Sequence, residues 1–192
     1  MSKKPLVVSY PRSGVNWFCR AFETITGQRS PGQDRGIVSN KQRPAFRRTH
    51  TTESVRLCRR FRDGVLDSVL LLLRDPAWSY ARRHTCPFPF SAYIHNIEFF
   101  DRCSWPKKLV YYDELFTEAS IYDIVDWMEI PHGTFEDFEQ TLAASHTWYA
   151  TTKHPRYDPR EPTMADRQAA HCECRTRLGP VLYRKYLGRY AS

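Results

Sequence analysis

Residues 9–17 read Ser-Tyr-Pro-Arg-Ser-Gly-Val-Asn-Trp, a combination of residue types that suits phosphate or sulfate. Arg12 supplies a permanent positive charge, and Ser13 and Asn16 supply neutral hydrogen-bond donors. Gly14 permits close approach of the backbone to a ligand. A short apolar segment before the loop predicts a strand, and apolar residues at helical spacing after it predict a helix. The N–H groups of such a turn face one point, where the helix dipole favours an anion. The loop alone therefore predicts anion binding, with an ordinary strand-to-helix turn as the alternative.

Two further polar residues follow predicted strands. His50 ends the strand-like segment 46–50, and Arg74 follows 66–73, a nearly continuous apolar run typical of a strand buried on both faces. Asp75 and Pro76 then favour the start of a helix. Because the carboxyl ends of parallel strands share one edge of a sheet, we expect Arg12, His50 and Arg74 to converge there.

These segments resemble three motifs of the sulfotransferase family. The first loop is similar to the family's 5′-phosphosulfate loop, Tyr-Pro-Lys-Ser-Gly-Thr-Thr-Trp, with Arg12 for Lys and Val15-Asn16 for Thr-Thr. His50 lies where the family has the general base of Lys-Thr-His. Arg74-Asp75-Pro76 resembles the 3′-phosphate segment, whose Ser lies eight residues after the Arg; here Ser79 lies five after Arg74.

The resemblance implies a sulfotransferase that uses 3′-phosphoadenosine 5′-phosphosulfate (PAPS) and releases 3′-phosphoadenosine 5′-phosphate (PAP), without a metal. An in-line sulfuryl transfer to a hydroxyl or amine would use His50 as general base and Arg12 to stabilise charge. The acceptor would be a small molecule or a glycan, and no nucleic acid is expected as a partner. The nucleotide-binding residues it implies are Arg12, Ser13, Gly14, Val15, Asn16, Trp17, Arg74 and Ser79.

Two other classes of protein stay open. A P-loop-type kinase or nucleotide hydrolase is disfavoured, because the sequence has neither a G-x-x-x-x-G-K-[ST] run nor an evident magnesium-binding acidic strand end. A non-catalytic basic module that binds nucleic acid or another polyanion would agree with the formal net charge of +8. The basic residues are spread through the chain instead of forming one tract, which disfavours nucleic acid.

The chain length of 192 residues predicts one domain over 1–192, in the α/β class. We expect a three-layer sandwich with a central parallel sheet of four to five strands flanked by helices. The resemblance implies the P-loop-NTPase-like sulfotransferase fold. The predicted strands are 6–8, 46–50, 66–73 and 108–112. The predicted helices are 17–25, 51–61, one from 76 through 80 and beyond, 121–128, 135–142, and one from about 164 that breaks at Gly179-Pro180.

The remaining segments carry weaker predictions. Segments 28–45 and 148–162 are interpreted as basic loops, and the Pro-Phe-Pro-Phe piece at 87–90 either lines an acceptor pocket or packs in the core. His171-Cys172-Glu173-Cys174 is thin support for zinc, because no second ligand pair lies at a suitable spacing. Since no run approaches the ~20 apolar residues of a membrane span, we expect a cytoplasmic protein with reduced cysteines.

Overall fold

A computed structural model describes residues 4–31, 43–53, 66–151 and 161–191. Its centre is one sheet in the order β2-β1-β3-β4, and every neighbouring pair is parallel. The strands are β1 (Lys4–Ser9), β2 (Arg47–Thr49), β3 (Leu66–Leu73) and β4 (Lys107–Tyr111). This arrangement confirms the predicted parallel α/β sheet and the four predicted strands.

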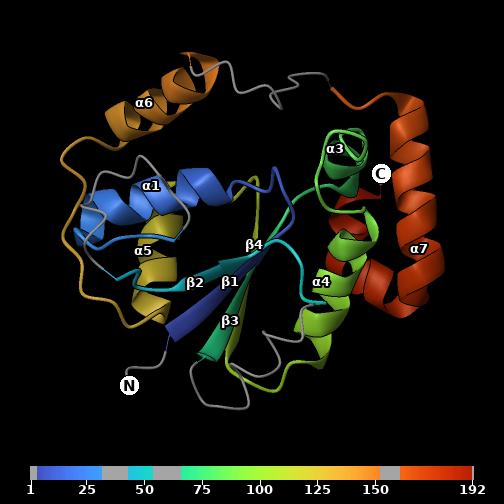
Figure 1. Cartoon of the computed structure of the whole chain (residues 1–192), viewed down its shortest axis with the longest axis horizontal. Coiled ribbons are helices and arrows are strands. Elements are labelled where there is room, and N and C mark those ends of the chain that lie inside the picture. Colours follow the sequence, from blue (N-terminus) through green and yellow to red (C-terminus); the bar gives the residue numbers. More distant parts are fainter. Residues whose placement is uncertain (1–3, 32–42, 54–65, 152–160, 192) are drawn as a thin grey trace.

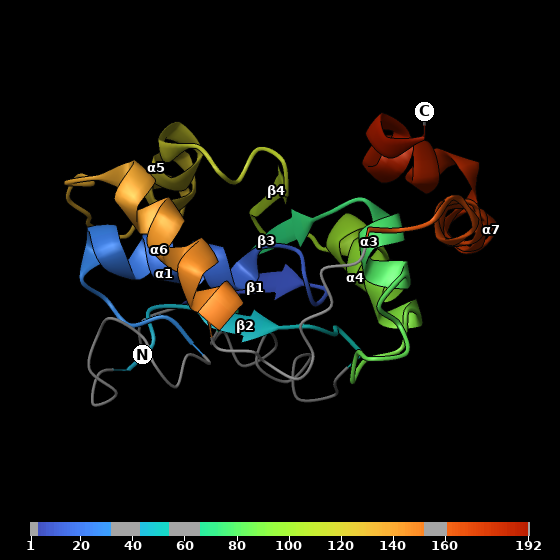
Figure 2. The ribbon, with the colours of Figure 1, turned by 90° about the horizontal axis from the view of Figure 1, so that it is seen from above.

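The central strands β1 and β3 are apolar on both sides because helices cover both faces of the sheet (Figures 1 and 2). Val7 pairs with Leu70 and both contribute to one core cluster, whereas Val8 pairs with Leu71 and both contribute to the other. Such strands are the nearly continuous apolar runs of the sequence.

The described helices divide evenly between the two faces, as Figure 1 shows. On one face lie α1 (Val15–Thr26), α5 (Glu118–Trp127) and α6 (Phe138–Thr151). On the other lie α3 (Pro76–Tyr80), α4 (Ser91–Arg102) and α7 (Met164–Leu187), which the short 3₁₀ turn η1 (Gly188–Tyr190) follows. The three-layer prediction is therefore confirmed.

Local sequence signals determine several helix ends. Helix α1 ends at Gly27, whose left-handed backbone (φ 61°) closes the last turn. The Asp75 side chain accepts a hydrogen bond from the N–H of Ala77 at 2.8 Å, so it caps α3 with Pro76 in the first turn. Helix α7 is interrupted at Gly179 (φ 73°), as predicted, and begins with a capping box formed by Thr163 and Asp166.

Several predicted boundaries are wrong, among them the start of the helix predicted from 135, since α6 begins at Phe138. Helix α3 does not continue beyond Tyr80. Helix α4 was not predicted at all, because polar residues such as Asn96 interrupt the apolar face that includes Tyr93 and Ile97. Helix α6 extends to Thr151 instead of giving way to a loop at 148. Residues 51–53 of the predicted helix 51–61 are not helical, and the rest of it lies outside the described residues. Within the described part of the chain, no helix has the length and apolar character needed to cross a bilayer.

Candidate functional site

The strand order creates a crevice at the carboxyl ends of β1 and β3. The chain leaves β1 toward β2 on one side, and β3 lies on the other side of β1, so the direction of connection reverses between them. Open α/β sheets bind ligands at this switch point. The Arg12 loop follows β1, Arg74 follows β3, and His50 follows β2, the other neighbour of β1. The topology therefore brings the three predicted positions to one edge.

The Arg12 loop has a backbone that suits an anion. Arg12 (φ 77°) and Gly14 (φ 81°) have left-handed backbones, and Ser13 between them does not. Alternation of this kind turns successive N–H groups toward one side and forms an anion-binding concavity. The loop ends at the N-terminus of α1, where the first N–H groups of a helix lack acceptors within the helix. The N–H of Ser13 donates to the Tyr10 carbonyl at 3.2 Å, which closes the turn.

The Ser13 hydroxyl is buried and has no hydrogen-bond partner among the described residues. A buried hydroxyl without a partner costs about 1–3 kcal/mol, so such groups call for an explanation. An anion bound at the loop would supply oxygens that can accept a hydrogen bond from this hydroxyl. The residues of the loop thus fit a bound phosphate or sulfate group.

Gly14 has a packing role that the sequence did not reveal. A Cβ atom at this position would lie 2.7 Å from Cδ2 of Leu115 and 3.2 Å from Cδ2 of Tyr112. The space beside Gly14 is therefore filled by the segment after β4, and the glycine is required by protein contact as well as by its positive φ.

Replacing Gly14 with alanine should lower the free energy of unfolding by about 2–4 kcal/mol, because left-handed strain of about 1–2 kcal/mol adds to overpacking. Gly27→Ala is the matched control. Gly27 is also left-handed, but no described atom lies within 4 Å of the Cβ that alanine would add there. Urea unfolding of both variants would separate strain from contact. Equal losses would show that the Leu115 contact is unimportant.

Val15 and Asn16 begin α1 but differ in surroundings. Val15 is buried, so only its N–H can serve a ligand. The Asn16 amide oxygen accepts a hydrogen bond from Nη1 of Arg48 at 2.9 Å, which joins the loop to β2.

The Trp17 indole packs inside the protein. It is 4% exposed, stacks on Phe116 with ring centroids 5.8 Å apart, and meets Phe138 edge-on. Its Nε1–H donates to the Leu115 carbonyl at 3.3 Å. These contacts anchor α1 to the segment after β4, and the nucleotide-binding role of Trp17 stays a prediction.

Arg74 connects the two candidate phosphate segments. Its Nη1 donates to the Arg12 carbonyl at 3.0 Å, and its guanidinium carbon lies 4.2 Å from the Trp78 ring and 3.9 Å from the Tyr112 ring. Both ring contacts are cation–π in type. Burial lowers the pKa of Arg74 below its usual value, but the group stays charged at neutral pH. A guanidinium carries five N–H donors, so Arg74 can hold the Arg12 carbonyl and a bound anion at the same time.

Asp75 and Ser79, which follow Arg74, differ in whether their side chains have partners within the described structure. Asp75 faces α7, where its carboxylate pairs with Nη1 of Arg167 at 3.0 Å and lies 3.5 Å from Nε2 of His171. Ser79 is 1% exposed, and its hydroxyl has no hydrogen-bond partner among the described residues. Like the Ser13 hydroxyl, it is a buried donor that a ligand could satisfy.

His50 is held in one tautomer. Nδ1 lies 2.8 Å from the Ser9 carbonyl oxygen, which can only accept, so Nδ1 carries the proton and Nε2 carries the lone pair in the neutral ring. The backbone carbonyl of His50 accepts from Nδ2 of Asn96 at 3.1 Å. Burial lowers the pKa of His50, and the charge of Arg48 lowers it further, against the opposing hydrogen bond to Ser9. The neutral, proton-accepting form therefore dominates at neutral pH.

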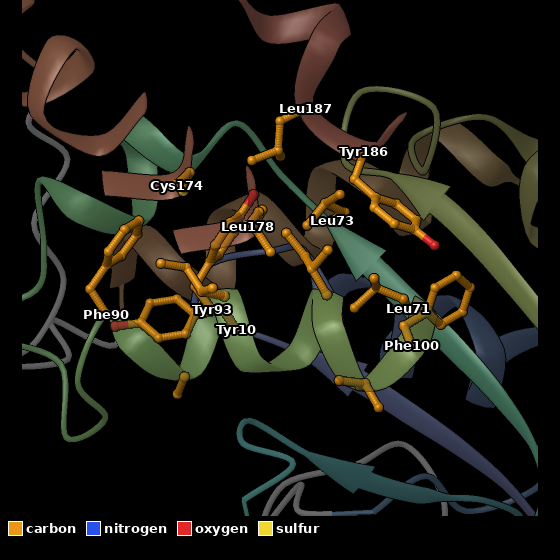
Figure 3. Close-up of a cluster of buried hydrophobic side chains, with 14 of the residues drawn as sticks. Tyr10, Leu71, Leu73, Phe90, Tyr93, Phe100, Cys174, Leu178, Tyr186 and Leu187 are labelled. Atoms are coloured by element: carbon orange, nitrogen blue, oxygen red, sulfur yellow. The ribbon is translucent and has the colours of Figure 1, made fainter. Parts of the chain in front are cut away.

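The aromatic piece at 87–90 packs partly in the core, as one of its two alternatives predicted, and its role in an acceptor pocket stays a prediction. Phe90 is buried beside Tyr10 and Tyr93 (Figure 3), and the Tyr10 hydroxyl donates to the Phe88 carbonyl at 2.9 Å. The Phe88 ring is partly exposed and lies 5.5 Å from the His50 ring. Phe90 thus packs in the core, while Phe88 lies beside the candidate base.

Sequence reasoning missed Arg82, which is 7% exposed and lies over the same Trp78 ring as Arg74. The signal was present in the spacing, because Arg82 lies eight residues after Arg74, where the resembled family has its serine. It also missed Tyr112, whose ring covers Arg74.

The segment at 171–174 does not form a metal site in the described structure. Cys174 is buried and Cys172 is exposed, while Nδ1 of His171 lies 2.8 Å from the Tyr183 hydroxyl. Across the described ranges, no group of three or more His, Cys, Asp and Glu side chains is arranged to hold a metal.

Comparisons with known proteins find similarity among solved structures. No protein-family model matches the sequence, and no curated protein matches it. Among solved structures, the chain is similar to the mouse sulfotransferase SULT7A1 complexed with PAP, with 15% sequence identity and a TM-score of 0.47. The match covers 96% of this chain and 84% of that chain. The identity and the TM-score are too low to show a family or an activity.

Proposed function

We propose that this protein is a sulfotransferase that moves a sulfuryl group from PAPS to a hydroxyl or amine. The observation that carries the proposal is the joined arrangement of its three candidate groups at one sheet edge. Arg74 donates to the backbone of Arg12, and His50 donates to the backbone of Ser9 at the end of β1. The motif resemblance rests on residue types and spacing, whereas this arrangement rests on contacts between distant segments, so the two support the proposal separately.

Two sets of residues would bind the two ends of the donor nucleotide. The N–H groups and side chain of the Arg12 loop, with the Ser13 hydroxyl, would hold the 5′-phosphosulfate. Arg74, with the buried hydroxyl of Ser79 nearby in sequence, would hold the 3′-phosphate. The hydrogen bond between Arg74 and the Arg12 carbonyl couples the two ends, since the position of one fixes the position of the other.

The transfer needs a base that takes the proton of the acceptor group and donors that stabilise the charge on the leaving oxygen. The acceptor oxygen or nitrogen bonds to sulfur as the bond from sulfur to the phosphate oxygen breaks, and PAP leaves with the electron pair. By analogy with phosphoryl transfer, charge should build on the leaving oxygen in a loose transition state. Arg12 and the loop N–H groups would stabilise that charge. The acceptor's proton passes to Nε2 of His50.

Phe88 and His50 would form the acceptor side of the site. The partly exposed Phe88 ring offers an apolar wall beside the base, a combination that suits a hydroxyl carried on an apolar or ring-shaped acceptor. A magnesium-dependent kinase is less well supported, because Asp75 after β3 is already paired with Arg167 and caps α3.

Calorimetric titration with PAP, 5′-AMP and ATP tests the donor assignment. We expect PAP to bind most tightly, and Arg74→Ala to weaken PAP by about 10- to 100-fold, since a hydrogen bond to a charged group contributes about 1.5–3 kcal/mol. Arg102→Ala is the matched control, because Arg102 is exposed and pairs with Glu98 on its own helix, α4. Binding of ATP as tight as that of PAP would contradict the proposal.

A further inference from the structure

The candidate base His50 lies just beyond the end of an edge strand. Strand β2 ends at Thr49, and Thr49 and Val8 are the last pair between β2 and β1, so His50 lies outside the ladder of paired residues. Residues 50–53 form neither helix nor strand. The position of the His50 backbone therefore depends on contacts other than those of the sheet.

Helix α4 provides two such contacts. The Asn96 side chain donates from Nδ2 to the His50 carbonyl at 3.1 Å. One residue earlier in the helix, the His95 carbonyl accepts a hydrogen bond from Oγ1 of Thr52 at 3.2 Å. The chain that follows β2 thus reaches α4 (Figures 1 and 2), and the helix holds it at two points.

Asn96 is a costly residue for the core. It is 2% exposed and lies on the inner face of α4 with the apolar residues Tyr93 and Ile97. Its Nδ2 bonds to the His50 carbonyl, but its Oδ1 is buried without a hydrogen-bond partner among the described residues. An apolar side chain of the same branched shape would leave no amide oxygen unpaired. Packing therefore does not explain an asparagine at this position, whereas the contact with His50 does.

Different elements hold the two sides of His50. Its ring is fastened to β1 by the hydrogen bond between Nδ1 and the Ser9 carbonyl, and its carbonyl is fastened to α4 by Asn96. The hydrogen bond at one ring nitrogen decides which nitrogen of a neutral imidazole carries the proton. If the His50 backbone moved away from α4, Nδ1 would lose the Ser9 carbonyl, and the ring would populate both tautomers. Only the Nδ1–H tautomer leaves the Nε2 lone pair for an acceptor's proton.

We propose that Asn96 is a positioning residue that acts through the His50 carbonyl and holds the imidazole in its Nδ1–H tautomer. The consequence for catalysis rests on the proposed function, whereas the tautomer is a property of the folded chain itself. Because Arg12 and Arg74 are assigned to the nucleotide and Asn96 is not, loss of Asn96 should lower kcat without weakening PAP.

Nitrogen NMR of the His50 ring measures the tautomer directly at about pH 8, where the neutral form dominates. Asn96→Leu removes the donor and keeps the branched shape, so it should convert part of the ring to the Nε2–H tautomer. With phenol as the acceptor probe, kcat should fall by about 10- to 100-fold, the range expected for a misplaced catalytic group, and the Kd of PAP should stay unchanged. Asn96→Gln, which keeps an amide donor, should recover part of both losses.

Two further variants separate the contact from general loosening of α4. Thr52→Val removes the second contact with α4 at constant shape, so it should shift the tautomer in the same direction by less. Ile97→Val is the matched control, because Ile97 is a buried neighbour on the same helix whose shortening lowers stability. It should leave both the tautomer and kcat unchanged.

The outcomes distinguish this inference from the proposed function. If the wild type neither prefers PAP to 5′-AMP and ATP nor sulfates phenol, the proposed function fails, and the tautomer alone decides the role of Asn96. If Asn96→Leu keeps the wild-type tautomer, or if Ile97→Val disturbs it equally, the inference is overturned. A shifted tautomer with unchanged kcat overturns the catalytic consequence. Thermal unfolding checks each variant, and if Asn96→Leu does not fold, Asn96→Ala decides by the same criteria.

Discussion

Replacing His50 with glutamine should lower kcat for sulfuryl transfer by about 10²- to 10⁴-fold, the range expected when a general base is removed. The glutamine amide can still form a hydrogen bond but cannot take a proton at neutral pH. Binding of PAP should change little, because His50 contacts the Ser9 carbonyl and not the Arg12 loop. Single-turnover rates measured beside PAP titration would separate the two effects.

The pH dependence provides the second measurement on His50. The lowered pKa means that the ring loses its proton below its usual 6.5, so kcat/KM should hold its plateau at pH 7 and fall only as pH drops through a value below 6.5. This acid limb should disappear in His50→Gln. A wild-type limb above pH 7, or a limb that survives the substitution, would contradict the assignment of His50 as base.

Replacing Arg12 with alanine should lower kcat by about 10²- to 10³-fold, because it removes a preorganised donor for the leaving oxygen. Arg12→Gly provides a control of unusual clarity, since glycine adopts the left-handed backbone of this position (φ 77°) without strain. Both variants lack the charge, so both should lose the same factor in kcat.

The two Arg12 variants should differ only in stability. Arg12→Gly should be more stable than Arg12→Ala by about 1 kcal/mol, because alanine keeps the left-handed strain. Urea unfolding measures this difference. If the glycine variant recovers most of the activity, the backbone of the loop and not the charge of Arg12 would be the important feature.

The sheet was predictable because its signals are local. The apolar run 66–73 and the polar groups that follow each strand are readable without tertiary information. Helix α4 was not predictable, because the buried side chain of Asn96 breaks the apolar period on the inner face of the helix. Asn96 is buried there and donates a hydrogen bond to the His50 carbonyl. A tertiary hydrogen bond explains that residue, and no local pattern encodes it.

The candidate site divides in the same way. Residue types at 12, 50 and 74 could be recognised from motifs, but their neighbours could not. Trp17 is suited to a ligand by its type, yet Phe116, a distant residue in sequence, stacks on it. The contact of Arg82 with Trp78 is readable from the i,i+4 spacing, but no local pattern shows that the same ring also meets Arg74.

The hydrogen bond from His50 to Ser9 has a consequence for motion. Ser9 ends β1, and the Arg12 loop begins with the next residue, so the candidate base is fastened to the same strand end that carries the anion-binding loop. A displacement of β1 would carry both groups together and leave their separation unchanged. No closure of one domain over another is needed to set that separation. Core substitutions that tilt the sheet should therefore reduce the free energy of unfolding well before they reduce the rate of the chemical step.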